Sequence, residues 1–391
     1  MKIALCIRKI LGRAGGAERV LVDTANYLSS RGHEVEIWHF DKRPGKPFYP
    51  LTSRCNIVPL LPWRKRSSPL SRLSGTWIES LPGLNWLSRE AAHGTYRRCL
   101  RARLLSFRPD VAVGYLCDTF PYLIEAARGL NIPVVASCHS VPARDFADPT
   151  RWDPNPYDRH KRLALLDEAA VTTVIQPEFI EWFPKKLQPR IRVLENPVTR
   201  TPGYADVRQD PQRNIILAVG RLAASKGHET LIKSWSRIHR SFPAWKLRIC
   251  GDGELMPKLE QLVLALGLKE RVELAGAVAD IMSEYEKAKF LAMPSLYEGF
   301  GLSAAEAMLK GLPVIAFSDC PGLNKVVVNG VNGILLKGLD KEAELAEGLR
   351  LLIEDNDKRL RLANQAPETM QKFTAELVLP KWEALLEELV V

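Results

Sequence analysis

Short runs of apolar and β-branched residues recur along the chain, and each is followed by a segment whose apolar residues have helical spacing. In the first half these runs cover residues 2–7, 34–40, 111–116, 133–139 and 171–177. They are nearly continuous rather than alternating, as is typical of parallel strands that helices cover on both faces. The pattern therefore predicts an α/β fold built on parallel sheet.

The same pattern restarts after a polar stretch, residues 199–214, that contains Pro202, Gly203 and Pro211. The second set of runs covers residues 215–220, 246–251, 272–276, 290–295 and 313–317. A chain of 391 residues is also too long for one typical hydrophobic core. We therefore expect two doubly wound domains, 1–198 and 199–376, with a ligand-binding cleft at the carboxyl ends of their strands.

Composition narrows the class of protein. A hydrophobic content of 46% and a charged content of 26% are ordinary for a soluble globular protein. The seven cysteines form no CxxC pair, which argues against a zinc site or a disulfide framework and fits a reducing cytoplasm. The start of the chain turns charged too soon for a signal peptide, and no apolar run approaches the ~18 residues of a membrane span.

Charge is unevenly distributed along the chain. Residues 1–200 carry 31 Lys and Arg against 19 Asp and Glu, whereas residues 201–391 carry 24 against 26. A basic first half indicates an anionic partner, which could be a phosphorylated substrate, an anionic lipid surface or a nucleic acid.

The stretch SLYEGFGLSAAEAMLKGLPVIA, residues 295–316, places two acids eight residues apart around two glycines. Glu298 falls in the expected strand-to-helix loop and Glu306 in the early turns of the helix. Gly299 and Gly301 let main-chain amides approach a ligand closely, and the helix amino end favours a diphosphate. The acids then suit hydroxyl groups of a ribose and a sugar. A glycine-rich turn with a solvated glutamate is the alternative.

Two further loops have the same character. GRLAASKG places Arg221 and Lys226 directly after the run 215–220, where two cations can neutralise a diphosphate leaving group, although they could be ordinary surface charges. GRAGGAER places Gly15 and Gly16 after the first run, where an ordinary tight turn is the alternative. His139 ends the run 133–139 and is either structural or catalytic. The sequence has no HExxH, GxSxG or DxD-like motif, so it favours chemistry without a metal or other cofactor.

Together these motifs resemble the retaining glycosyltransferases of family 4, which have the two-domain GT-B fold. The resemblance covers nearly the whole chain, and its most specific part is the pair Glu298 and Glu306. It implies a hexosyltransferase that moves a hexose or N-acetylhexosamine from a nucleotide sugar, commonly UDP-linked, to a saccharide. It also implies that a C-terminal helix, about residues 377–391, packs back onto the N-terminal, acceptor-binding domain.

The resemblance assigns roles position by position. Glu306 would bind the ribose and Glu298 the donor sugar, while Arg221 and Lys226 would bind the diphosphate. His139 would lie near the reacting carbon. The remaining donor contacts would come from Gly15, Gly16, Gly276, Val278 and the backbone of Gly299, Phe300, Gly301 and Leu302. Ala277 and Ser140 differ from the residues that are common in the family, so base contacts there and a role for Ser140 are not implied.

Residues 61–105 form a segment rich in basic and aromatic residues, which predicts the surface that binds the acceptor. Tryptophans mixed with cations suit the interface of an anionic membrane, although they could also belong to an amphipathic helix with a buried apolar face. We expect a peripheral enzyme at the inner face of the cytoplasmic membrane, acting on a lipid-linked saccharide or lipopolysaccharide. The residues expected at this surface are Trp63, Arg64, Lys65, Arg66, Trp77 and Trp86.

Two other classes of protein remain open at this point. A nucleotide-sugar epimerase has the same architecture and would turn over its substrate without an acceptor. A nucleic-acid-binding protein would account for the basic half, but the aromatic residues form no stacking motif, so we expect no nucleic-acid partner.

Overall fold

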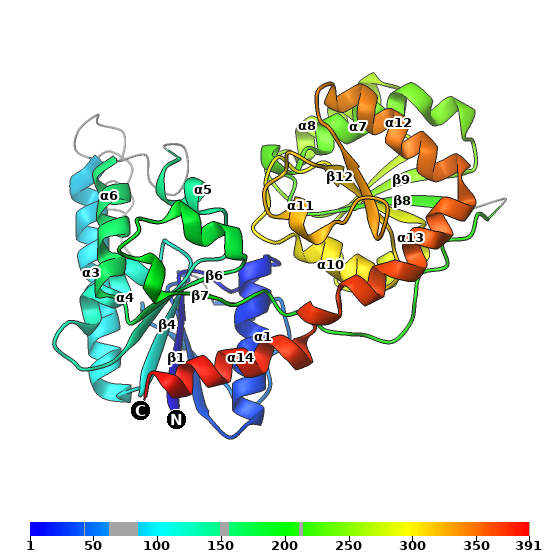
Figure 1. The fold of residues 1–391 in the computed structure, drawn as a ribbon. Helices are drawn as coiled ribbons and strands as arrows, with labels where there is room; N and C mark the ends of the chain where they lie inside the picture. The colour runs from blue at the N-terminus through cyan, green and yellow to red at the C-terminus, as the bar shows by residue number, and fades with distance from the viewer. Residues whose placement is uncertain (43, 62–84, 149–155, 211–213, 391) are drawn as a thin grey trace. The chain divides into compact units, whose positions relative to one another are not determined.

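The computed structural model of the chain describes residues 1–42, 44–61, 85–148, 156–210 and 214–390, with the backbone alone for 85–92 and 156–158. The chain forms two compact units, each built around its own parallel sheet (Figure 1). Unit 1 comprises Met1–Glu195 and Leu379–Val391, and unit 2 comprises Asn196–Val378. This division falls a few residues from the boundaries expected from the sequence, 198/199 and 376/377.

The sheet of unit 1 has seven strands in the order β3-β2-β1-β4-β5-β6-β7, all parallel. The strand order reverses between β1 and β4, and the carboxyl ends of strands at such a switch point are where doubly wound sheets bind ligands. The strands are β1 (Lys2–Ile7), β2 (Glu34–His39), β3 (Asn56–Pro59), β4 (Val111–Tyr115), β5 (Val134–Ser137), β6 (Val171–Val174) and β7 (Ile191–Val193).

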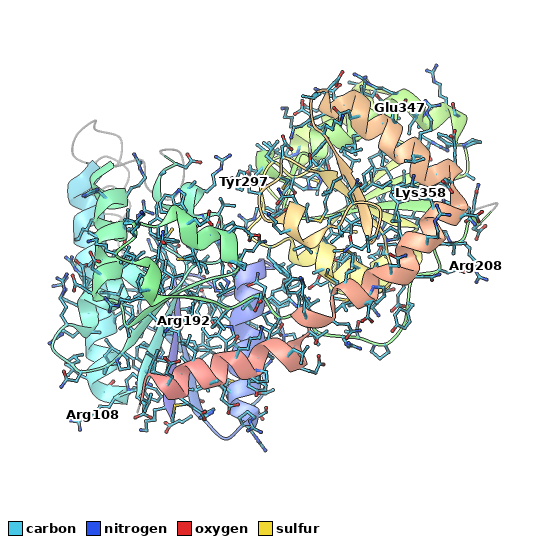
Figure 2. The ribbon with its side chains drawn as sticks, in the orientation of Figure 1. Arg108, Arg192, Arg208, Tyr297, Glu347 and Lys358 are labelled. Carbon is cyan, nitrogen blue, oxygen red and sulfur yellow. The ribbon has the colours of Figure 1, made fainter. Side chains whose placement is uncertain are left out.

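Helices flank this sheet and bury its apolar strands (Figures 1 and 2). In β1, for example, every residue after Lys2 is buried. Proline occupies one of the first two positions of α4 and of α5, where its missing N–H costs no helical hydrogen bond. The helices are α1 (Gly16–Ser30), α3 (Asn85–Phe107), α4 (Phe120–Ala127), α5 (Pro142–Phe146), α6 (Pro156–Leu165) and α14 (Ala375–Glu388), whose later turns belong to unit 1.

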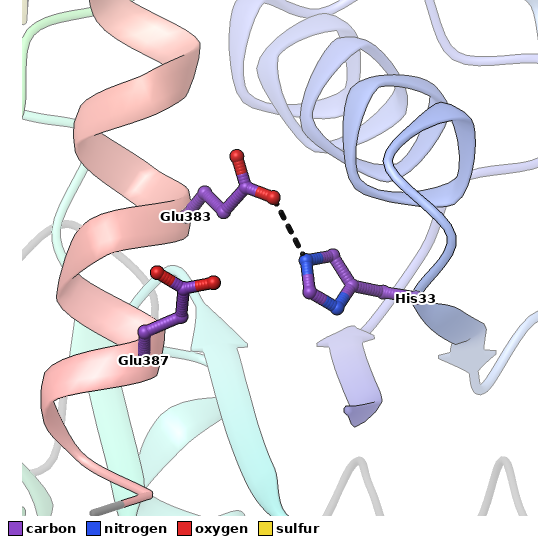
Figure 3. A group of neighbouring side chains, drawn as sticks. All are labelled: His33, Glu383 and Glu387. Atoms are coloured by element: carbon purple, nitrogen blue, oxygen red, sulfur yellow. Dashed lines mark hydrogen bonds and ion pairs between the residues drawn. The ribbon is translucent and has the colours of Figure 1, made fainter.

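An aromatic stack and a polar cluster are among the contacts that attach α14 to the rest of unit 1. Trp382 is buried and its ring stacks on that of Tyr115, with centroids 6.0 Å apart. Glu383 accepts hydrogen bonds from Tyr27 and Arg31 and lies 3.0 Å from Nε2 of His33 (Figure 3). Burial tends to raise the pKa of Glu383, but these three partners hold it below its ordinary value. The helix is thus fixed by both an apolar and a charged contact.

The carboxylate of Glu387 lies beside the same pair of side chains (Figure 3). His33, Glu383 and Glu387 each offer one atom that could ligate a metal ion, and these atoms lie within 4.8 Å of one another. Arg31 lies 3.2 Å from Glu383 and already compensates its charge. We therefore interpret this cluster as an attachment of α14.

The sheet of unit 2 has six parallel strands in the order β10-β9-β8-β11-β12-β13, so its switch point lies between β8 and β11. Every run predicted as a strand forms one. Among the strands of the described residues, the sequence pattern missed β3, β7 and β13. The strands are β8 (Asn214–Val219), β9 (Trp245–Cys250), β10 (Val272–Gly276), β11 (Phe290–Met293), β12 (Val314–Phe317) and β13 (Gly333–Leu336).

Unit 2 has seven α-helices within the described residues: α7 to α11 connect its strands, and α12 and α13 follow the last strand. Three begin at an aspartate whose side chain accepts a main-chain N–H of the first turn: Asp280, Asp340 and Asp355. Each such cap stabilises a helix by about 1 kcal/mol. The helices are α7 (His228–Ile238), α8 (Met256–Ala265), α9 (Ile281–Lys287), α10 (Leu302–Leu309), α11 (Leu323–Val326), α12 (Lys341–Glu354) and α13 (Asn356–Thr369).

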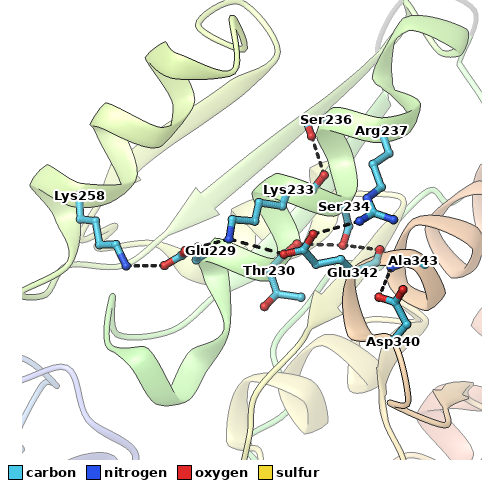
Figure 4. A network of polar contacts seen from close by, with 10 residues as sticks. All are labelled: Glu229, Thr230, Lys233, Ser234, Ser236, Arg237, Lys258, Asp340, Glu342 and Ala343. Atoms are coloured by element: carbon cyan, nitrogen blue, oxygen red, sulfur yellow. Dashed lines mark hydrogen bonds and ion pairs between the residues drawn. The ribbon is translucent and has the colours of Figure 1, made fainter.

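An ion-pair network lies over α7, α8 and α12 (Figure 4). Glu229 pairs with Lys233 and Lys258, and Glu342 pairs with Lys233 and Arg237. These side chains are at least one-third exposed, so each pair contributes less than about 1 kcal/mol. The buried cluster around Trp235 and Trp245 therefore holds this side of unit 2 together. None of the described helices is both long and apolar enough to cross a bilayer.

Candidate active site

The candidate donor site of unit 2 is formed by two loops that follow neighbouring strands. Arg221 and Lys226 follow β8, and Glu298 follows β11, its partner at the switch point. The loops are joined by a hydrogen bond from the Leu296 N–H to the Ser225 carbonyl, 2.8 Å long. The fold thus brings together the two motifs that the sequence presents 72 residues apart.

Lys226 and Glu298 form an ion pair in this site. The ammonium of Lys226 lies 2.6 Å from Oε1 of Glu298, and the Ser295 hydroxyl donates to the same oxygen at 2.7 Å. The Glu298 side chain is only 11% exposed, so the pair is well shielded from water. Ser295 is a site residue that the sequence motifs did not identify.

Arg221 differs from Lys226 in its surroundings. Its side chain is exposed at the end of β8, and no carboxylate of the described residues forms an ion pair with it. The site therefore offers one compensated cation and one that is available to an anion. A guanidinium can bind two phosphate oxygens at once, which makes it well suited to a diphosphate.

Gly227 sets the close approach of the two loops. Its φ of 68° is left-handed, and it joins the short 3₁₀ turn η4 (Ala224–Lys226) to α7. A Cβ on Gly227 would lie 2.2 Å from the carbonyl oxygen of Pro294 in the other loop. Only glycine fits both the conformation and the space.

His228, the first residue of α7, is a second site residue that the motifs did not identify. The ring is 3% exposed, and neither nitrogen has a partner of hydrogen-bonding geometry among the described residues. Burial, and then the charge of Lys226, lower its pKa to about 4, although the main chain of Gly220 and Arg221 acts in the opposite direction. At neutral pH a neutral imidazole therefore lies beneath the cationic loop.

Glu306 is buried in α10 and accepts a hydrogen bond from the hydroxyl of Tyr285, 3.1 Å away on α9. It also borders a cavity of about 50 Å³ that Arg200, Thr201 and Gln371 help to line. Tyr285 was not among the predicted site residues. Its hydroxyl orients the carboxylate that the sequence motif assigns to the ribose.

The remaining predicted donor residues of unit 2 lie on three segments. Gly301 precedes α10, Leu302 is its first residue and is half-buried, and Gly299 lies in the loop before them. Phe300 is buried, with its ring 4.9 Å from that of Phe373, so only its main chain is available to a ligand. Gly276 ends β10, and Val278 is half-buried just beyond it.

The predicted residues of unit 1 lie at the carboxyl ends of β1 and β5. Gly15 precedes α1 and Gly16 is its first residue. His139 follows β5, with Nε2 2.9 Å from the Ser137 hydroxyl and its ring stacked on Tyr115, 5.1 Å between centroids and 8° between planes. Thr173 donates to that hydroxyl at 2.9 Å, which leaves the Ser137 proton available to Nε2 of His139.

The structure does not describe the side chains of the residues predicted to contact the membrane and the acceptor. Trp63, Arg64, Lys65, Arg66 and Trp77 lie outside the described residues, as does the side chain of Trp86 in α3.

Comparisons with known proteins agree with this geometry. The family profile "Glycosyltransferase Family 4" matches residues 14–201, and "Glycosyl transferases group 1" matches residues 205–369. A Campylobacter jejuni enzyme, GalNAc-alpha-(1->4)-GalNAc-alpha-(1->3)-diNAcBac-PP-undecaprenol alpha-1,4-N-acetyl-D-galactosaminyltransferase, is 28% identical over 389 residues, 99% of both chains.

Solved structures share the fold over the full length. Sucrose-phosphate synthase from Thermosynechococcus elongatus superposes with a TM-score of 0.78 at 20% identity, covering 100% of this chain and 99% of that one. Anabaena Alr3699/HepE in complex with UDP-glucose superposes with a TM-score of 0.72 at 20% identity, covering 99% and 100%.

The two sheets and these comparisons define the class first: the protein is a glycosyltransferase with the GT-B fold. More narrowly, the chain belongs to glycosyltransferase family 4. The fold, the enzyme class and the family predicted from the sequence motifs are therefore confirmed.

Proposed function

We propose that the protein is a retaining glycosyltransferase that moves a hexose or N-acetylhexosamine from a UDP-sugar to a lipid-linked saccharide or to lipopolysaccharide. The reaction takes place at the inner face of the cytoplasmic membrane, with the enzyme peripherally bound. The observation that carries this proposal is the pairing of Lys226 with Glu298 beside the exposed Arg221 at the switch point of unit 2.

In this proposal Arg221 and Lys226 bind the donor diphosphate. Lys226 keeps its contact with Glu298 and adds one to a phosphate oxygen, while Glu298 accepts a hydroxyl of the sugar. Glu306, oriented by Tyr285, accepts the ribose hydroxyls. The main chain of Gly299 to Leu302, with Gly276 and Val278, completes the donor contacts. Gly15, Gly16 and His139 of unit 1 supply contacts from the other domain.

The proposed transfer proceeds on one face of the sugar. The bond between the anomeric carbon and the diphosphate oxygen breaks, and the bond to the acceptor oxygen forms on the same side. The leaving diphosphate takes the proton of the acceptor hydroxyl. The cations stabilise the charge that develops on the diphosphate: one cation at 4 Å in an effective dielectric near 20 contributes ~4 kcal/mol. These cations can serve without a bound metal.

The acceptor part of the proposal is supported by the Campylobacter relative, whose name describes a substrate linked through a diphosphate to undecaprenol. It is also supported by the excess of cations in residues 1–200. A diphosphate on a membrane lipid is an anionic partner that such a half can attract.

A transfer assay tests the proposal. The protein is incubated with UDP-sugars and polyprenyl-diphosphate saccharides, and the anomeric configuration of the product is determined by NMR. We expect acceptor-dependent transfer with retained configuration that persists in EDTA. Consumption of the UDP-sugar without any acceptor would instead favour the epimerase, and an inverted product would contradict the mechanism.

The membrane part is tested separately. Replacing Arg64, Lys65 and Arg66 with glutamate should weaken binding to phosphatidylglycerol vesicles, since each cation near an anionic surface contributes about 1 kcal/mol. Unchanged vesicle binding would refute peripheral attachment through this segment.

A further inference from the structure

The loop between β1 and α1, residues 8–15, gathers three cations at the switch point of unit 1. Arg8, Lys9 and Arg13 lie within this loop, which contains no acidic residue. β1 lies beside β4 in the sheet, and Asp118 follows the carboxyl end of β4. This is the position at which a doubly wound sheet binds its ligand, and the donor contacts assigned above leave these three cations without a role.

The loop is held in place by its main chain. The N–H groups of Ile10 and Leu11 donate to Oδ2 of Asp41 at 2.9 and 3.2 Å, and that of Gly12 donates to the carbonyl of Lys46 at 3.0 Å. The Asp41 carboxylate is thereby used to fix the backbone. The cations are thus presented by an ordered loop, which lowers the entropic cost of binding a ligand.

One of the cations is held rigidly as well. Arg8 is half-buried, and its guanidinium lies 5.3 Å from the centroid of the Tyr96 ring on α3. Such a cation–π contact fixes the plane of the guanidinium while its N–H groups remain available at the edge. Lys9 and Arg13 both follow this fixed group in the sequence, and both are exposed.

The three cations are only partly compensated by a nearby acid. Burial tends to lower the pKa of Arg8, but Tyr96 and the charge of Asp118 raise it, so Asp118 offsets part of the positive charge. Among the described residues no carboxylate forms a salt bridge with Arg8, Lys9 or Arg13. The pKa of Lys9 is lowered, first by burial and then by the charges of Arg13 and Arg8, and the opposing effects of Asp41 and Asp118 do not cancel this. Like charges held together in this way repel one another, and a bound anion would relieve the repulsion.

We propose that Arg8, Lys9 and Arg13 bind the phosphate or diphosphate group of an anionic acceptor. Arg8 and Arg13 can each take two phosphate oxygens, and Lys9 adds a point charge. The site rests on the proposed function, because it specifies the acceptor as one that carries a phosphate close to the saccharide. It is distinct from the donor cations Arg221 and Lys226, which belong to unit 2.

The test uses the full chain with a defined probe, farnesyl diphosphate, and farnesol as its uncharged counterpart. Binding is measured by calorimetry with UDP present at saturation, so that the donor site is occupied. The double variant Lys9→Gln with Arg13→Gln removes two exposed charges. We expect wild type to bind farnesyl diphosphate and not farnesol, and the double variant to bind it at least ~10-fold more weakly with unchanged UDP affinity.

A matched control removes two other exposed cations of unit 1. In the double variant Lys185→Gln with Arg192→Gln, Arg192 (labelled in Figure 2) belongs to β7, four strands from β1 in the sheet, and Lys185 precedes that strand. This variant should bind farnesyl diphosphate like wild type. If both double variants lose the same affinity for farnesyl diphosphate, net charge alone would account for the effect, and the proposed site would be refuted.

Two further outcomes overturn the proposal, and both leave the proposed donor chemistry separately testable. Failure of wild type to bind farnesyl diphosphate would show that no acceptor phosphate is recognised here. Weakened UDP binding in the Lys9 and Arg13 variant would assign the loop to the donor diphosphate. Neither outcome bears on whether UDP-sugars bind at Arg221 and Lys226, which is measured with the donor alone.

Discussion

Lys226 contributes to the site through its contact with Glu298. The pair is short and shielded, so removing the cation leaves a carboxylate with little access to water beside the place proposed for the diphosphate. The ammonium would stabilise the leaving group chiefly as its charge develops. This makes Lys226 a residue whose effect on rate should exceed its effect on binding.

We expect Lys226→Ala to reduce kcat for sugar transfer by about a thousandfold while weakening UDP binding by less than about tenfold. Steady-state kinetics and calorimetry with UDP give the two numbers. Lys233→Ala, which removes a lysine from the exposed network on α7, is the control and should leave both unchanged. Equal losses in kcat and in UDP affinity would show that Lys226 does not act specifically in the transition state.

The buried imidazole of His228, at the candidate donor site, should make the stability of the folded protein depend on pH. Its folded pKa of about 4 lies below the ordinary value of 6.5, so the unfolded chain takes up a proton first as the pH falls. The neutral ring therefore imposes no penalty above pH 6.5, and stability is lost progressively as the pH falls from there towards 4. Between pH 7 and pH 5 the loss from this group is about 2 kcal/mol.

The variant His228→Gln should lack the loss of stability that protonation of His228 causes between pH 7 and pH 5. Urea denaturation at pH 7 and pH 5 should show a free energy of unfolding that falls by about 2 kcal/mol less in the variant than in wild type. Using the difference between the two proteins removes the contributions of all other titrating groups. The same loss in both would mean that His228 is protonated in the folded protein.

At the scale of elements, the junction of η4 with α7 positions the donor cations. Gly227→Ala would combine an unfavourable left-handed φ with a contact of 2.2 Å to the Pro294 carbonyl, so the loop carrying Lys226 must move. We expect UDP binding to weaken by at least about tenfold, measured by calorimetry.

Gly267→Ala is the matched control for this variant. Gly267 has a similar φ of 66°, but a Cβ there would meet no atom within 4 Å. It should lower stability by about 1 kcal/mol and leave UDP affinity unchanged. Equal UDP affinity in both variants would show that the close approach at Gly227 does not position the site.

The attachment of α14 is a second feature at this scale, because Trp382 stacks on Tyr115 and Tyr115 stacks on His139. We expect Trp382→Ala to lower the free energy of unfolding by about 3–5 kcal/mol and Trp382→Phe by clearly less. Chemical denaturation measures both, and the ¹⁵N NMR signals of His139 should shift in the alanine variant. Glu376→Gln, an exposed position of α14 outside the His33 cluster, is the control and should change neither the stability nor the His139 signals. An unshifted His139 signal would show that the stack does not position the histidine.

The sequence pattern predicted the elements that are continuous apolar runs, and it missed the short ones at the sheet edges. β3, β7 and β13 lie at the edges of their sheets and are partly exposed, so they do not read as fully buried apolar runs, whereas the equally short inner strands β5, β6, β11 and β12 do. The motif residues could be identified because each pair is closely spaced in one segment: Arg221 and Lys226 after β8, and Glu298 and Glu306 in the segment that runs from β11 into α10. Their partners follow from tertiary structure: Tyr285 reaches Glu306 across 21 residues of sequence, and His228 gains its character from burial.

At the scale of the whole molecule, cations lie at the switch point of each unit, and the excess of positive charge lies in the first half of the chain. The donor cations follow β8, which lies beside β11 in unit 2. The cations of the β1–α1 loop lie in unit 1, within the basic first half of the chain. We thus assign the nucleotide diphosphate to unit 2 and an anionic acceptor to unit 1. The acceptor assignment depends on the donor assignment, because without a nucleotide-sugar donor there is no transfer.

Donor binding is therefore the measurement that tests the account most directly. A panel of UDP- and GDP-sugars is added to wild type and to Glu306→Gln, and the melting temperature is recorded. A ligand at 100 times its Kd stabilises the folded state by ~2.7 kcal/mol. We expect at least one UDP-sugar to raise the Tm of wild type by several degrees and to raise that of Glu306→Gln much less. A panel that leaves the wild-type Tm unchanged, or that shifts both proteins equally, would contradict it.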